Sequence, residues 1–167
     1  ALIGEIYKEM EQYDKAEPLL LKALAIFEKS LGPEHPDTAT RLNNLAELYF
    51  FQGLDNKAEP LYLRALTIAE KNLDKNYPNA AFALSDLGNI YLFQGRYQLA
   101  EKTLSRSLAL RENAEDKNEY AIAKDLKDLG DVYISLNKLV KAETAYLRSL
   151  GLREKILGPN NSLTVNT

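Results

Sequence analysis

Cysteine and tryptophan are absent from the 167 residues of the chain, and His35 is its only histidine. Without cysteine, the chain can form no disulfide, no thiolate metal site and no cysteine nucleophile. One histidine leaves no second imidazole for a metal site or a nucleophile relay, and no glycine-rich phosphate loop is present. The sequence therefore predicts no catalytic residue, no metal site, no cofactor and no enzyme activity, and we interpret His35 as a local turn contact.

Basic clusters and long apolar runs are also missing. Lys and Arg number 21 against 24 Asp and Glu, which gives a net charge of −3, and no basic block occurs. Nucleic-acid binding depends mainly on clustered Lys and Arg, and a membrane span needs about 18 or more consecutive apolar residues. We therefore expect a soluble, cytoplasmic protein without nucleic-acid or membrane partners. Because the chain begins at Ala1 inside a helical pattern, without Met or a signal peptide, we also expect it to be a piece of a longer protein.

Glycine and proline are few, with 8 and 6 copies, whereas the helix-forming residues Leu, Ala, Lys and Glu are abundant. Similar side chains recur every 42 residues, with no insertion or deletion. A fixed period of this kind indicates stacked copies of one supersecondary unit. The recurring columns are Tyr7, Tyr49, Tyr91 and Tyr133; Ala16, Ala58, Ala100 and Ala142; Glu17, Glu59, Glu101 and Glu143; Ile3, Leu45, Leu87 and Leu129; and Leu24, Leu66, Leu108 and Leu150.

Each unit carries helical periodicity twice. In the second unit, apolar residues recur at helical spacing over 42–49 and again over 58–69. Gly53 between them supplies the left-handed conformation that ends a helix, so a tight turn joins two antiparallel helices. We assign Pro18 and Pro60 to the first turn of the second helix of their repeats, where a missing backbone donor costs little.

Helix-ending and helix-capping residues separate the units. Residues 31–37 hold a glycine, two prolines and Asp37, and we expect Asp37 to cap the next helix. Residues 73–79 keep one proline, with Asn79 as the expected cap, whereas residues 115–120 have neither Gly nor Pro and predict less sharply fixed helix ends. These linkers divide one array into a truncated first repeat (1–36), a second (37–78), a third (79–120), a fourth (121–162) and the stub of a fifth (163–167).

A column of small residues predicts close helix packing. Gly4, Ala46, Gly88 and Gly130 are expected to face the Ala16, Ala58, Ala100 and Ala142 column, so that two helices approach closely. A single helix pair cannot bury both of its faces, and stacked pairs can. The expected fold is therefore an all-α solenoid of antiparallel helix pairs, with a concave and a convex surface.

These residues resemble the tetratricopeptide repeat (TPR), in the 42-residue form found in kinesin light chains and in many bacterial arrays. The resemblance rests on Leu42, Leu45, Ala46, Tyr49, Ala58, Tyr62 and Ala65, and on stretches such as GPEHPDTATRLNNLA, and it covers nearly the whole chain. It implies a right-handed superhelical array of about four repeats in which the first helix of each pair lines the concave groove. It also implies a non-catalytic scaffold that binds a peptide or partner protein in that groove.

The first-helix stripe opposite the core face contains the residues that we predict to bind a ligand. They are Asn43, Asn44, Glu47, Phe50, Phe51, Phe82, Asp86, Asn89, Phe93, Lys124, Lys127 and Asp131. Aromatic residues on such a face are typical binding anchors, although packing against the neighbouring repeat is the alternative interpretation of each phenylalanine.

Charge on this stripe suggests the ligand's character. With Glu5, Lys8, Glu9 and Asp128 included, the stripe holds six acids and three bases. We expect an apolar or aromatic ligand with neutral or basic residues, because an acidic peptide would meet like charge. The basic residues that hold acidic peptides in kinesin light chains are missing from the second and third repeats. Only Lys124 and nearby Asn residues match the carboxylate clamp of chaperone-binding TPR domains.

The alternative function is structural. The chain could be a self-assembly or spacer segment of a larger multidomain protein, pairing end to end or through its groove with another copy. Concentration-dependent light scattering separates this function from binding to a different partner.

Overall fold

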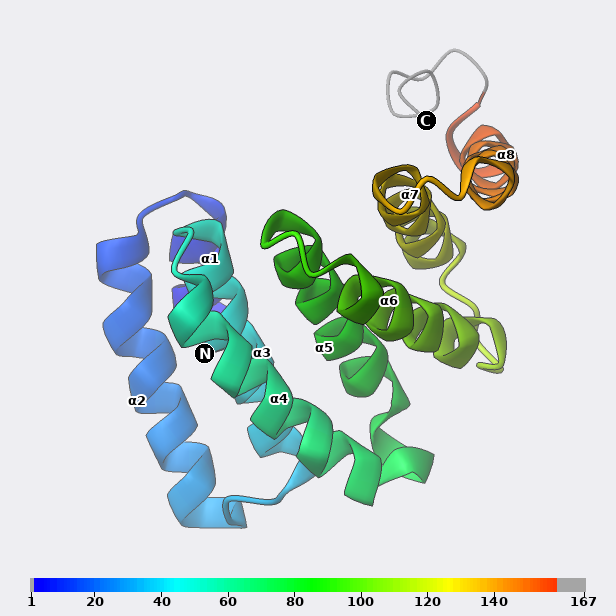
Figure 1. Cartoon of the computed structure of the whole chain (residues 1–167). Helices are drawn as coiled ribbons and strands as arrows, with labels where there is room; N and C mark the ends of the chain where they lie inside the picture. Colours follow the sequence, from blue (N-terminus) through cyan, green and yellow to red (C-terminus); the bar gives the residue numbers. More distant parts are fainter. Residues whose placement is uncertain (1, 159–167) are drawn as a thin grey trace. The chain divides into compact units, whose positions relative to one another are not determined.

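The computed structural model describes residues 2–158, without the side chains of residues 2, 9 and 73–77. This part of the chain forms eight α-helices and no strand (Figure 1). The first helices of the repeats are α1 (Leu2–Glu9), α3 (Pro36–Phe51), α5 (Leu73–Phe93) and α7 (Glu119–Ser135); the second helices are α2 (Tyr13–Leu31), α4 (Asp55–Lys71), α6 (Tyr97–Glu112) and α8 (Leu139–Leu157). The predicted all-α class is confirmed. Residues 163–167, the expected stub of a fifth repeat, lie outside the described residues.

Helices that are neighbours in sequence pack on one another in each of two compact units. The first unit, residues 1–86, contains α1 to α4 and the start of α5, with α1 on α2, α2 on α3 and α3 on α4. The second unit, residues 87–167, contains the end of α5 and α6 to α8, with α6 on α7 and α7 on α8. The boundary between the units lies inside α5, so it coincides with no predicted repeat boundary.

The turn inside each helix pair uses a left-handed residue at the same repeat position. Gly53 and Gly95 have φ of 70° and 71°, which confirms the prediction for Gly53. At the equivalent positions, Glu11 and Asn137 adopt φ of 56°, although neither is glycine. A side chain with a Cβ is strained in this conformation, and Asn tolerates it better than Glu. Two of the four turns therefore fold the same way despite a less suitable residue.

Hydrogen bonds fix these turns to the tyrosine column. In the second repeat, the N–H of Leu54 donates to the carbonyl of Tyr49 (2.8 Å) and the N–H of Gly53 donates to Phe50 (2.9 Å). This pair of bonds is a Schellman motif, which satisfies the last carbonyls of a helix. The long bond recurs on the carbonyls of Tyr7, Tyr91 and Tyr133 at 2.8–2.9 Å.

Side-chain caps between the repeats differ from the predicted ones. His35 caps α3 by accepting a bond from the backbone N–H of Asp37 (3.1 Å), so His35 is a local turn contact as expected. Asp37 lies in the first turn of α3 and is not the cap. The sequence also missed the cap of α7, where Asn118 Oδ1 accepts from the N–H of Ala121 (3.0 Å) and fixes the start of the helix.

Helix α5 begins earlier than predicted. Residues 72–79 contain no glycine, and the chain re-enters a helix at Leu73, so Asn79 lies inside α5 and does not cap it. Instead, Asn79 links α5 to the second repeat: its Nδ2 donates to Thr40 Oγ1 (2.9 Å), and its carbonyl accepts from Asn43 Nδ2 (3.2 Å).

Pro18 and Pro60 lie beyond the first turn. Helices α2 and α4 begin at Tyr13 and Asp55, directly after the turn of each pair, so both prolines fall in the second helical turn. The prediction of a first-turn position was wrong because the tight turn leads into the helix sooner than the apolar pattern indicated. Each proline therefore leaves one helix carbonyl without its usual donor.

The small-residue column does allow close approach, but the facing residues are not the predicted alanines. A methyl group at Gly88 would lie 2.4 Å from Leu104 Cγ, and one at Gly130 would lie 2.4 Å from Tyr146 Cε1. Leu104 and Tyr146 occupy one repeat position, four residues after the alanine column. Glycine at these two sites therefore makes room for a large side chain of the second helix.

Candidate binding surface on the first helices

Two phenylalanines are the most exposed of the predicted binding residues. Phe51 and Phe93 are the last residues of α3 and α5, and their side chains are 56% and 76% exposed. They stand 42 residues apart, at the same position of consecutive first helices. A cavity of about 300 Å³ lies beside Phe51, lined also by Lys8, Glu11, Tyr13 and Glu47.

The other two predicted aromatic anchors are partly covered by neighbours within the first unit. Phe50 packs against Phe51, with ring centroids 6.0 Å apart. Phe82 lies 6.5 Å from the ring of Tyr62, which belongs to the second helix of the preceding repeat. Both side chains are half-buried. Packing between repeats, the alternative interpretation for each phenylalanine, therefore describes Phe82.

The predicted amide residues serve the fold. Asn43 is only 2% exposed, and its Nδ2 donates to the carbonyl of Asn79, as described above. Asn44 is half-buried and donates to Glu5 Oε1 at 2.5 Å. Asn89 is buried. The amides of Asn43 and Asn44 thus link neighbouring repeats.

Glu5 and Glu47, two described carboxylates on the stripe of the first unit, both have donors. Glu5 accepts from Arg41 (3.2 Å) as well as from Asn44, and Glu47 forms an ion pair with Lys8. Arg41, which was not among the predicted residues, also places its guanidinium 5.0 Å from the ring centroid of Phe27. The signal was its position 36 residues after Glu5, a spacing that recurs in the ion pairs between repeats.

Asp86 is buried and accepts a hydrogen bond from the hydroxyl of Tyr62 (2.7 Å). Burial of Tyr62, together with the neighbouring Asp86 carboxylate, raises the pKa of its hydroxyl far above the ordinary value. Tyr62 therefore stays a neutral donor, and Asp86 is held by the fold.

Carboxylates of the second unit are paired along one helix. Lys124 donates to Asp128 at 3.1 Å and Lys127 donates to Asp131 at 2.6 Å, both one helical turn apart on α7. Asp131 also accepts from the hydroxyl of Tyr146 (2.7 Å). The carboxylates of Asp128 and Asp131 are therefore neutralised by lysines of the same helix.

Among residues 2–158, no group of three or more His, Asp or Glu side chains is arranged to hold a metal ion. No helix in the same part of the chain is long and apolar enough to cross a membrane. The described surface consists of helix faces, turns and the ion pairs between them.

Comparison with known proteins identifies the repeat. The tetratricopeptide repeat family model matches residues 1–71, 42–113 and 79–155. A search of curated proteins found no match to the sequence. Among solved structures, BtubC (BKLC) from P. vanneervenii is similar with a TM-score of 0.83 and 25% identity, over 97% of this chain and 65% of that chain. The chain thus spans less than two thirds of the length of BtubC.

Two structures of a kinesin light chain-like protein from Podosopora anserina, with nearly identical TPR-like repeats, share the fold. Their TM-scores are 0.80 and 0.79 at 21% identity, over 98% of this chain and 77% and 78% of those chains. The matches, the 42-residue period and the eight helices agree with one another. The chain belongs to the tetratricopeptide repeat family, and its fold is similar to that of the kinesin light chain-like repeats.

Proposed function

We propose that this chain is a non-catalytic, cytoplasmic interaction module that binds an extended segment of a partner protein along its first helices. The observation that carries the proposal is the pair Phe51 and Phe93, exposed at one repeat position on consecutive first helices. Large aromatic side chains at the solvent surface lose unfavourable hydration when a partner covers them, and such residues dominate interface energies. The twelve residues predicted above are the proposed binding set, with Phe51 and Phe93 as its anchors.

The proposed ligand is an apolar or aromatic segment with neutral or basic residues. Glu11 borders the cavity beside Phe51, and Glu47 lies in the same wall. Lys8 already pairs with Glu47, so Glu11 supplies the additional negative charge of this cavity. A basic residue of the ligand next to an apolar one would match this arrangement.

Two labelled peptides test the proposal. Both carry the same Leu-Phe core, flanked by Lys in one and by Glu in the other, and fluorescence anisotropy gives their affinities. We expect the Lys peptide to bind more tightly, and Phe51→Ser/Phe93→Ser to weaken it by about tenfold or more. The matched control is Leu63→Ser/Leu147→Ser, which removes two exposed apolar residues from second helices. Tighter binding of the Glu peptide, or an equal loss in the control, contradicts the proposal.

Self-assembly is the second candidate function. Ile3 and Ile6 of α1, and Met10 directly after it, are exposed apolar residues, which favours association with a second copy. Light scattering across a range of protein concentrations distinguishes the two functions. A monomer that changes mass only when a partner is added supports binding, whereas self-association abolished by Ile3→Ser/Ile6→Ser supports assembly.

A further inference from the structure

A second, apolar cavity lies among α6, α7 and α8, within the second unit and away from the proposed anchors. Its volume is about 230 Å³, and its apolar lining includes Leu108 of α6 with Leu126, Leu129 and Tyr133 of α7. Leu126 and Leu129 are core residues, so the cavity reaches down to the packed interior of the helix pair. Its size suits one large side chain better than a drug-sized ligand, which needs about 300 Å³ or more.

Three residues of α8 distinguish the lining of this cavity from the equivalent residues of the second repeat: Val140, Thr144 and Ala145, where Thr144 replaces Pro60. Ala145 stands where the second repeat has Leu61, so the side chain that lines the cavity is smaller and leaves more space. Val140, at the mouth, stands where the second repeat has Asn56, and its side chain is 78% exposed. The fourth repeat thus combines extra space with an exposed apolar edge.

The surrounding frame is the same in both repeats. Lys141 lies 5.4 Å from the ring centroid of Tyr133, as Lys57 lies 4.8 Å from that of Tyr49. Arg148 forms an ion pair with Glu112 of the preceding repeat. The equivalent Arg64 forms an ion pair with Glu28 of its preceding repeat, at 2.7 Å. The cation–aromatic contact and the ion pair around the cavity therefore recur in both repeats, while three lining residues differ.

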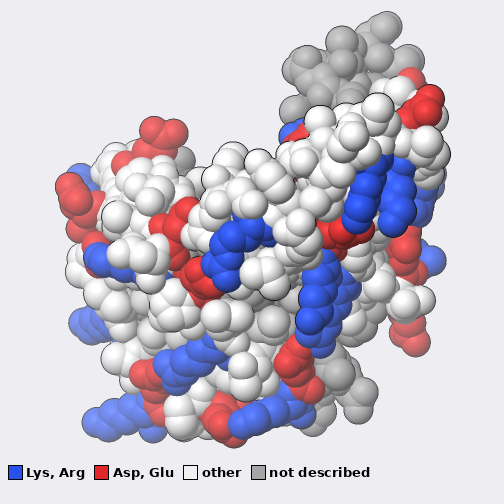
Figure 2. All heavy atoms as spheres, in the orientation of Figure 1, with Lys and Arg blue, Asp and Glu red and all other residues white. Residues whose placement is uncertain are grey.

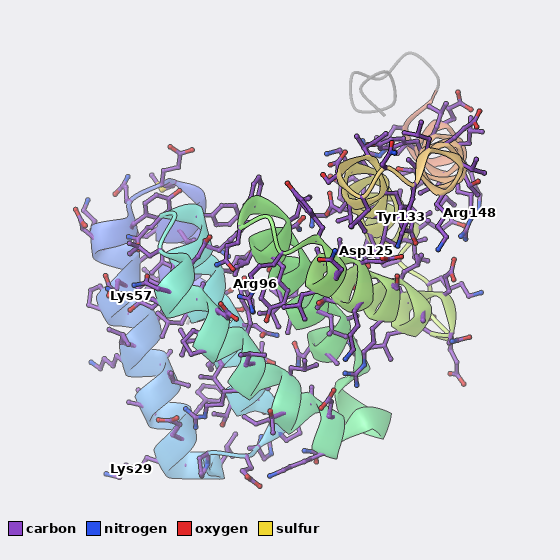
Figure 3. The ribbon with its side chains drawn as sticks, in the orientation of Figure 1. Lys29, Lys57, Arg96, Asp125, Tyr133 and Arg148 are labelled. Atoms are coloured by element: carbon purple, nitrogen blue, oxygen red, sulfur yellow. The ribbon has the colours of Figure 1, made fainter. Side chains whose placement is uncertain are left out.

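Positive charge borders the cavity. Lys141 and Arg148 line it, and their side chains are 61% and 52% exposed. Figure 2 shows Lys and Arg side chains gathered beside α8, the helix on which Figure 3 labels Arg148. The carboxylate nearest to Lys141 is Glu101, at 3.8 Å, and Glu101 already accepts from Lys138 at 2.6 Å. With Glu112 beside Arg148, three cations stand against two carboxylates.

Charge in the sequence has the same bias. Residues 87–167 carry twelve Lys and Arg against ten Asp and Glu, whereas residues 1–86 carry nine against fourteen. The second unit is thus net positive although the chain as a whole is net negative. An acidic partner is attracted to this unit and repelled by the first.

We propose that this cavity is a docking site for one leucine- or phenylalanine-sized side chain of a partner segment that carries Asp or Glu beside it. The buried leucines provide the apolar contact, and Lys141 and Arg148 receive the acidic neighbour. Docking covers the exposed edge of Val140 and fills space that the fold leaves empty. The site differs from the proposed first-helix surface in location and in the charge of its ligand.

A labelled nonapeptide tests the site directly. The peptide has a central Leu flanked by Glu. Two control peptides replace the Leu by Ala or the Glu residues by Lys. Fluorescence anisotropy is measured at low salt, where electrostatic attraction is strongest. We expect the Leu-Glu peptide to bind at least about tenfold more tightly than either control peptide, a difference in binding free energy of about 1.4 kcal/mol.

Ala145→Leu is the decisive variant. It introduces the residue that the second repeat carries at this position, which is compatible with the scaffold, and thermal melting checks that the variant is folded. We expect it to weaken the Leu-Glu peptide at least tenfold. Lys141→Glu should also weaken binding, whereas Lys155→Glu, the same charge change elsewhere on exposed α8, should have less than half that effect.

Phe51→Ser/Phe93→Ser separates this site from the first-helix surface. We expect it to leave binding of the Leu-Glu peptide unchanged, just as Ala145→Leu should leave binding of the Lys-flanked peptide unchanged. Undiminished binding to folded Ala145→Leu, equal affinity for the three nonapeptides, or loss of binding only in the phenylalanine variant overturns the docking site. The Lys-flanked peptide's result decides the first-helix proposal independently.

Discussion

At the scale of single residues, the turn of each helix pair reveals a strained position. Glu11 adopts the left-handed conformation that Gly53 and Gly95 adopt without cost. A non-glycine residue there costs about 1–2 kcal/mol, while glycine also increases the entropy of the unfolded chain. We expect Glu11→Gly to raise the free energy of unfolding by about 0.5–1 kcal/mol. Urea denaturation measures the change.

The opposite substitution is the control for this prediction. Gly53→Ala places a Cβ in the same conformation and should lower the free energy of unfolding by about 1 kcal/mol. Asn137→Gly should change little, because Asn tolerates the left-handed region. Destabilisation by Glu11→Gly would show that its side chain contributes more than its backbone costs.

Close packing at Gly130 gives a second prediction. An added methyl group would lie 2.4 Å from Tyr146, so Gly130→Ala should destabilise the chain by about 1–3 kcal/mol. At Gly151, in helix α8, no atom lies within 4 Å of an added Cβ, and Gly151→Ala should stabilise by about 0.5–1 kcal/mol. Thermal unfolding of the two variants should shift in opposite directions. Equal shifts would mean that Tyr146 moves aside freely.

The hydroxyl of Tyr49 predicts a pH dependence. It donates to Glu17 (2.8 Å), and burial, followed by this bond and the Glu17 charge, raises the pKa of Tyr49 to about 12. A raised pKa stabilises the fold below the ordinary value of 10.0, and this stabilisation is lost as the pH rises towards 12. The difference in unfolding free energy between the natural chain and Tyr49→Phe should therefore shrink from pH 9 to pH 12. A constant difference contradicts a native-state interaction of the neutral hydroxyl with Glu17.

At the scale of elements, each contact between repeats uses different chemistry at one repeat position. Arg41 lies over Phe27 in the first contact, and Ala69 and Ala83 are fully buried at the equivalent places of the next. In the third, Asp125 of α7, labelled in Figure 3, accepts a hydrogen bond from Arg111 of α6 at 2.9 Å. The same helix geometry thus carries three different pairs.

The Arg111–Asp125 pair is buried, so its partners depend on each other. Asp125 also accepts from Ser107 (2.6 Å). Asp125→Ala leaves the guanidinium without its carboxylate and should cost about 3–5 kcal/mol. Arg111→Ala/Asp125→Ala should cost less than Asp125→Ala alone, as a double-mutant cycle by urea denaturation can measure. Additive losses would mean that the two charges do not interact.

Sequence periodicity predicts the helices, turns and close packing because those features depend on residue type at a fixed position. The start of α5 was predicted wrongly because Asn is a residue type that often caps helices. The hydrogen bond from Asn79 to Thr40 shows that Asn79 instead links α5 to the second repeat. The sequence also could not predict that Phe51 is exposed and Asn43 buried, because both lie on the same stripe of one helix. The contact with Asn79, which is distant in sequence, covers Asn43. Whether these residues bind a ligand is still a prediction.

At the scale of the whole molecule, the repeats are similar, but we expect that one repeat cannot replace another without loss of stability. Removal of residues 79–120 would join the second repeat to the fourth with the period intact, and would bring Asp125 to the partner position of Ala69. A buried carboxylate without its arginine is strongly destabilising. We expect the deletion variant to melt well below the full chain.

Asp125→Ala tests this explanation by a reversal of sign. In the deletion variant it restores alanine at the two positions that the buried Ala69 and Ala83 occupy in the full chain, and should raise the melting temperature, whereas in the full chain it should lower it. Circular dichroism on the four proteins measures both effects. The same sign in both backgrounds would show that the deleted repeat matters for another reason.

The unlike pairs at this one position also bear on misfolding. Chains built from near-identical units are prone to slip by a whole unit or to exchange units with another molecule during folding, because the wrong neighbour offers the same shape. If a repeat packed on the wrong neighbour, Asp125 would face Ala69 in place of Arg111, or Arg41 would face the like-charged Arg111. We therefore expect the Arg41–Phe27 and Arg111–Asp125 contacts to disfavour any assembly in which a repeat meets the wrong neighbour.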